Sequence, residues 1–146
     1  MMMKEEQQKL TEVMKQWQQI ENATISKTAA VMEGTTNPLI HLVMEIIQGD
    51  ANLHHRVQQT IVDSLERAAI AIRVEDIQTI WMALEEHLKI EKKSIELAEQ
   101  SLKALGSSGN VVQRYLISYL MEDERKHEKL LANLRLIKEG MYPYGG

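Results

Sequence analysis

Cysteine is absent from this chain of 146 residues, and proline, glycine and aromatic residues are scarce. Without cysteine the protein cannot form disulfides, thiolate zinc sites or iron–sulfur clusters, and it has no thiol nucleophile. Two prolines and seven glycines supply few of the turns that an all-β fold needs. Hydrophobic residues make up 44% of the chain, which argues against disorder. The composition therefore predicts a helical protein with one domain's worth of sequence.

An excess of positive charge is also missing, because 17 Lys and Arg residues face 21 Asp and Glu residues. A formal net charge of -4 argues against nucleic acid and anionic lipid as partners. The first eight residues are polar where a signal peptide would be apolar, and no stretch approaches the ~20 apolar residues of a membrane span. We therefore expect a cytoplasmic protein that can bind a metal only through histidine and carboxylate side chains.

Residues typical of turns gather at three places, 34–38, 106–110 and 140–146. Between them, apolar residues recur three and four positions apart, which predicts amphipathic helices. We expect helices over residues 4–33, from about 37, over 76–105 and over 110–138, with Asn37 and Asn110 as N-caps. The short connections predict two helical hairpins, about 4–70 and 74–139, within a single four-helix domain over residues 1–146.

Each predicted apolar stripe is interrupted by acidic residues or histidines near its middle. Glu21 lies 13 residues before Gly34, and Asp50 lies 13 residues after Asn37. At a rise of ~1.5 Å per residue, the two side chains share one level of their hairpin. The second hairpin repeats this arrangement, so we expect the polar groups to meet in one layer. Its members are Glu21, Asp50, His54, Glu91, Asp123 or Glu124, and His127.

The two halves of the chain also resemble each other as an internal repeat. Residues 20–25 align with 90–95 at an offset of 70, which pairs Glu21 with Glu91. At an offset of 73, Asp50 pairs with Asp123 and His54 with His127. The few matching positions include the polar residues of the stripes. Buried carboxylates without partners are costly, and divalent cations held by carboxylates and imidazoles would neutralise them.

The residues of this layer resemble the ferritin-like di-metal carboxylate proteins, in particular the rubrerythrin-type branch. That family carries Glu, Glu-x-x-His, Glu and Glu-x-x-His on four successive helices. Glu124-Arg125-Lys126-His127 matches the motif, the run 120–131 is similar to the family's fourth helix, and 90–96 is similar to its third. Glu21 fits the first position. The second helix departs from the pattern, because Asp50 precedes His54 by four residues.

The resemblance implies a ferritin-like four-helix bundle with iron as cofactor, about two ions per four-helix unit, and zinc or manganese as other possible metals. The expected metal ligands are Glu21, Asp50, His54, Glu91, Glu124 and His127, with Asp123 competing for the place of Glu124. An alternative frame in the second helix would use Asn52 and His55, but it loses the carboxylate. We assign His87 to a solvated helix face, and Trp17 and Trp81 to the core.

The predicted link between the second and third helices, residues 66–76, spans at most ~36 Å when fully extended. Helices of some 30 residues are ~45 Å long, so an intrachain bundle with these helices parallel is strained. A domain-swapped homodimer is the other solution. The expected function is the reduction of peroxide or dioxygen, or ferrous iron oxidation, with electrons from an external donor. The alternative is a helical bundle whose degenerate or single-metal site serves a binding or structural role.

Overall fold

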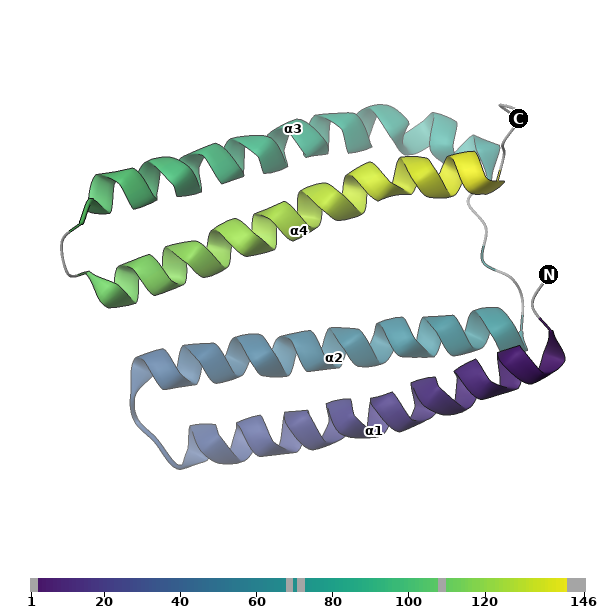
Figure 1. The fold of residues 1–146 in the computed structure, drawn as a ribbon, viewed down its shortest axis with the longest axis horizontal. Helices are drawn as coiled ribbons and strands as arrows, with labels where there is room; N and C mark the ends of the chain where they lie inside the picture. Colours follow the sequence, from purple (N-terminus) through teal and green to yellow (C-terminus); the bar gives the residue numbers. More distant parts are fainter. Residues whose placement is uncertain (1–2, 68–69, 71–72, 108–109, 142–146) are drawn as a thin grey trace. The chain divides into compact units, whose positions relative to one another are not determined.

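A computed structural model describes residues 3–67, 70, 73–107 and 110–141 of the chain. Four long α-helices account for nearly all of these residues, and they contain no strand (Figure 1). The predicted all-α class is therefore confirmed. Residues 68–69 and 71–72 of the predicted link, 108–109 of the second predicted turn, and 142–146 lie outside the described residues.

The first hairpin consists of α1 (Lys4–Glu33) and α2 (Pro38–Glu66). The turn between them ends at Asn37, whose side chain accepts hydrogen bonds from the backbone N–H groups of Leu39 at 2.9 Å and Ile40 at 3.2 Å. Pro38 follows as the first helical residue, where its missing N–H costs no hydrogen bond. The predicted N-cap and helix start are confirmed, and this cap directs α2 back along α1.

The second hairpin consists of α3 (Val74–Leu105) and α4 (Val111–Met141). Helix α3 begins two residues earlier than predicted. The Asp76 carboxylate accepts hydrogen bonds from the backbone N–H and from the guanidinium group of Arg73, and these bonds cap the first turn of the helix. It ends at Gly106, whose φ of 62° favours glycine. The Arg114 guanidinium donates a hydrogen bond to the Gly106 carbonyl, which ties the start of α4 to the end of α3.

The chain divides into two compact units, residues 1–70 and 71–146, and each contains one hairpin. Within each hairpin the two helices meet along a seam that includes buried polar residues. Only four of the described hydrophobic residues are buried, namely Met14, Ala51, Val62 and Ala98. Six polar or charged residues are also buried among the described residues, namely Thr11, Gln18, Glu21, Thr28, Gln58 and Glu91. Acidic side chains are almost never fully buried unless they are paired, so the burial of Glu21 and Glu91 in the seams requires partners.

Large apolar side chains remain exposed in each hairpin. In the first hairpin they include Trp17, Ile20 and Val57, and in the second they include Ile90, Leu120 and Leu130. Val57 lies one turn after His54 on α2, and Leu130 lies one turn after His127 on α4, so each pair shares one side of its helix. The expectation that Trp17 is core is wrong for its hairpin, where it is 49% exposed, because it lies beside the seam rather than in it. Trp81 is half-buried.

Among the described residues, no helix combines the length and the apolar character that crossing a bilayer requires.

Candidate metal centre

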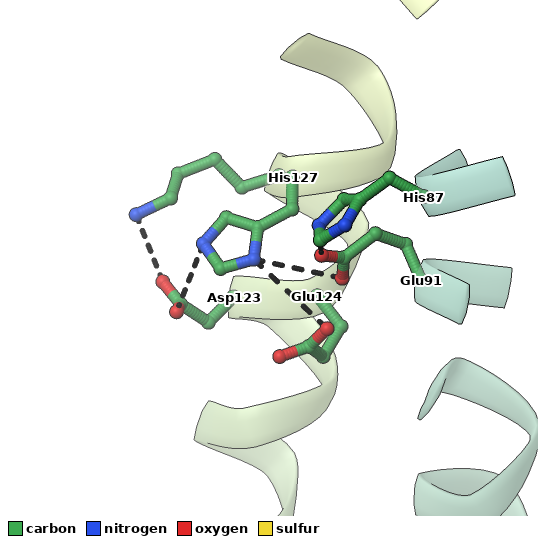
Figure 2. A network of polar contacts seen from close by, with 6 residues as sticks. His87, Glu91, Asp123, Glu124 and His127 are labelled. Atoms are coloured by element: carbon green, nitrogen blue, oxygen red, sulfur yellow. Dashed lines mark hydrogen bonds and ion pairs between the residues drawn. The ribbon is translucent and has the colours of Figure 1, made fainter. Parts of the chain in front are cut away.

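Glu91, Glu124 and His127 form a cluster across the seam of the second hairpin (Figure 2). Glu91 lies near the middle of α3, and Glu124 and His127 lie one turn apart on α4. Each residue offers one oxygen or nitrogen atom, and these ligand atoms all lie within 4.8 Å of one another. The Nδ1 atom of His127 is 3.6 Å from Glu91 Oε2 and 3.9 Å from Glu124 Oε2. The predicted Glu-x-x-His motif thus meets the predicted third-helix carboxylate.

Asp123 contacts the opposite side of the His127 ring. Its Oδ2 lies 3.4 Å from His127 Nε2, and its Oδ1 lies 2.8 Å from the ammonium group of Lys126. A carboxylate that holds one ring nitrogen fixes the orientation of an imidazole and leaves the other nitrogen to face a ligand. Figure 2 shows this order, with His127 between Asp123 on one side and the carboxyl groups of Glu91 and Glu124 on the other. Asp123 therefore orients His127.

His87 also contacts the cluster, although it lies on the exposed side of α3 where the sequence predicts it. Its side chain is half exposed, yet its Nε2 lies 2.9 Å from Glu91 Oε1. His87 and His127 thus contact different oxygen atoms of one carboxylate (Figure 2). The signal in the sequence was the spacing of four residues between His87 and Glu91, which places both on one side of a helix.

The two carboxyl groups of the cluster shift each other's pKa in opposite directions. The pKa of Glu124 is raised, first because its protonated form can donate a hydrogen bond to Glu91, and then by burial and by the negative charge of Glu91. The same hydrogen bond lowers the pKa of Glu91, and His127 and His87 lower it further. Burial acts against this decrease. The pair therefore favours one shared proton over two negative charges.

Burial makes the Glu91 carboxylate a good partner for a cation. Glu91 is 6% exposed, and its Oε2 has no hydrogen-bond partner. A buried carboxylate oxygen without a donor is costly, and a metal ion or a proton on Glu124 would compensate it. Carboxylate oxygens with imidazole nitrogen are ligands of iron, zinc and manganese. The residues present therefore fit such an ion.

The first hairpin places Glu21 and His54 together in the corresponding position. Glu21 is 7% exposed, and its Oε1 lies 3.5 Å from His54 Nδ1. A residue that the sequence analysis missed, Gln58, donates a hydrogen bond from Nε2 to the same oxygen at 3.4 Å. Its signal was an amide at the position that aligns with Leu131 in the internal repeat.

Asp50 is half-buried on α2, one turn before His54. In the described parts of the chain, no hydrogen bond or ion pair joins it to Glu21 or His54. The same described ranges contain one group of three ligand residues close enough to share an ion, the Glu91, Glu124 and His127 cluster. The ligand role of Asp50 stays a prediction.

Comparisons with protein-family models, curated proteins and solved structures found no match for this chain. The assignment of a function therefore depends on the geometry of the residues described above.

Proposed function

We propose that this protein binds a transition metal at the Glu91, Glu124 and His127 cluster and uses it in redox chemistry. The observation that carries the proposal is the convergence of three ligand atoms within 4.8 Å on a buried carboxylate whose Oε2 lacks a donor. Glu91, Glu124 and His127 would hold the ion, Asp123 would orient the imidazole, and His87 would contact the second oxygen of Glu91.

Iron is the metal that we propose, because a site of carboxylates and imidazole suits both of its common oxidation states. A bound iron ion would supply the electron transfer that no side chain of this cluster supplies by itself. The proposed reaction is the reduction of peroxide or dioxygen, coupled to ferrous iron oxidation. An external donor would return the electrons. Zinc or manganese would fit the same donor atoms, but zinc would not undergo a redox change.

The wider assembly that we propose is a ferritin-like four-helix unit. Each hairpin exposes apolar side chains beside its polar cluster, including Trp17 and Ile20 in one and Ile90 in the other. Many exposed large apolar side chains are typical of a surface that associates with another one. Two hairpins that bury these faces would enclose the polar residues, either within one chain or in a domain-swapped homodimer. The expectation of two ions per four-helix unit depends on this closure.

The decisive test is iron loading of the full chain under anaerobic conditions, followed by metal analysis and by addition of stoichiometric peroxide. We expect bound ferrous iron, and oxidation by peroxide that is faster than that of free ferrous ion. His127→Ala should lose both properties, because it removes the imidazole ligand. His41→Ala is the matched control, since His41 contacts the Thr35 carbonyl at the turn of the first hairpin. Wild-type protein that binds no metal would refute the proposal.

A second function is favoured by one observation, namely the absence of a second carboxylate beside Glu21. The position that corresponds to Glu124 is Ala51 in the first hairpin. This asymmetry favours a degenerate or single-metal site with a structural or binding role. In that case zinc should raise the melting temperature by mass action, while the iron-loaded protein should not react with peroxide faster than free iron.

A further inference from the structure

The internal repeat relates the polar clusters of the two hairpins residue by residue. Glu21 corresponds to Glu91, and both are buried. His54 corresponds to His127, and the Nδ1 atoms lie 3.5 and 3.6 Å from the respective glutamate. Each seam thus contains one buried glutamate and one histidine at nearly the same separation.

Two buried positions of the seam break this correspondence. Ala51 stands in the first hairpin where the second has Glu124, and Gln58 stands where the second has Leu131. Ala51 is 2% exposed and Gln58 is 3% exposed, so both residues are fully part of the seam. Compared with the second hairpin, the first hairpin therefore has one carboxylate fewer and one neutral amide more at these positions.

The amide compensates the remaining carboxylate without a cation. Gln58 donates a hydrogen bond to Glu21 Oε1 at 3.4 Å, and His54 contacts the same atom. In exchange, Gln58 Oε1 is buried without a hydrogen-bond partner. Such an unpaired acceptor is unfavourable, whereas a leucine would leave none. Gln58 therefore acts at this position through its N–H donor, which stabilises the buried carboxylate of Glu21 by a hydrogen bond.

The second hairpin has no neutral donor in the equivalent place. Instead, Glu91 and Glu124 converge with His127 so that their ligand atoms lie within 4.8 Å of one another, where a cation would compensate both carboxylates. We infer that the two half-sites are unequal: the Glu91, Glu124 and His127 cluster holds the tightly bound ion, and Gln58 is a positioning residue that keeps Glu21 as a hydrogen-bonded carboxylate of much weaker metal affinity. This inference rests on the proposed metal-binding function and extends it to the order in which metal sites fill.

The first experiment compares two equivalent substitutions, Glu21→Gln and Glu91→Gln, in the full chain. Zinc is titrated calorimetrically, because it suits the same ligands without redox change. We expect Glu91→Gln to weaken the tightest zinc site by about tenfold or more, a loss typical of disturbed metal sites. Glu21→Gln should leave that affinity within about threefold. Equal losses in the two variants would overturn the inference while leaving the metal-binding proposal intact.

The second experiment transfers the residues of the second hairpin into the first. The variant Ala51→Glu, Gln58→Leu places a second carboxylate beside Glu21 and removes the amide. We expect it to gain one further tight zinc site per chain, with an affinity within about tenfold of the natural one. A folded variant, checked by circular dichroism, that gains no site would overturn the inference.

These outcomes separate the inference from the proposal on which it rests. Wild-type protein that binds no zinc and no iron would refute both. Wild-type protein whose tightest site depends on Glu21 as strongly as on Glu91 would refute only the inequality of the half-sites. Should the transferred residues prevent folding, the comparison of Glu21→Gln with Glu91→Gln still decides the question.

Discussion

The adjacent carboxyl groups of Glu91 and Glu124 have pKa values shifted in opposite directions, although they belong to the same residue type. The raised pKa of Glu124 has its largest cause in the hydrogen bond to Glu91. The protonated carboxyl group of Glu124 stabilises the folded protein. This contribution is fully present below the ordinary glutamate pKa and is lost as the pH rises through the raised pKa. The lowered pKa of Glu91 acts oppositely, since its contribution is present above the ordinary pKa and is lost as the pH falls through the lowered one.

Metal-free protein should therefore lose stability as the pH rises from the ordinary glutamate range through the raised pKa of Glu124. We predict that Glu124→Gln removes this loss, because the amide keeps a donor toward Glu91 and has no proton to release. The measurement is the urea midpoint by circular dichroism across this pH range, with a chelator present. Glu122→Gln, an exposed site on the same helix, is the control and should keep the wild-type pH dependence. If Glu124→Gln also keeps it, the carboxyl pair does not share a proton.

The described parts of the two hairpins bury few apolar side chains. Interactions at the ends of the helices are therefore a relatively large part of their stability. Nucleating a helix fixes several residues before the first hydrogen bond repays the entropy, and capping reduces this cost. In the first hairpin the cap is the Asn37 side chain, which accepts from two backbone N–H groups at the start of α2.

We predict that Asn37→Ala lowers the free energy of unfolding of the first hairpin by about 1 kcal/mol, which is typical of a lost N-cap. Asn37→Ser is the matched control, since a hydroxyl oxygen can accept the same bonds and should retain most of the stability. Chemical denaturation followed by far-ultraviolet circular dichroism measures both variants. Equal stability of Asn37→Ala and wild type would show that the cap is dispensable.

At the scale of the whole molecule, the exposed apolar side chains of the hairpins are the surface through which we propose that the hairpins associate. Ile90 is exposed one turn after His87 on α3, whereas Met82 is exposed nine residues before Glu91, on the side of α3 opposite to that carboxylate. A buried face and a solvated face should respond differently to a new charge, because an unpaired buried charge is costly.

We predict that Ile90→Glu disrupts the association of hairpins and lowers the melting temperature by several degrees. Met82→Glu should change stability by less than about 0.5 kcal/mol, as exposed substitutions usually do. Light scattering shows whether the wild-type protein is the expected homodimer and whether Ile90→Glu alters its mass. Matching behaviour of the two variants would mean that the face of Ile90 is solvated.

The amino-acid sequence by itself was sufficient to predict the all-α class, the two hairpins and the placement of Glu91, Glu124 and His127 together. These features depend on local rules. Helical periodicity, turn residues and N-caps act over a few neighbouring positions, and the rise per residue converts a spacing into a level along a hairpin.

The tertiary structure decided which atoms of the seam contact each other. Periodicity places Trp17 in the apolar stripe of α1, but the rotation of each helix determines whether a side chain enters the seam or lies beside it. That rotation leaves Trp17 exposed beside the seam. It also buries Gln58 against Glu21. Such contacts depend on side-chain packing between two helices, which no spacing within one helix can specify.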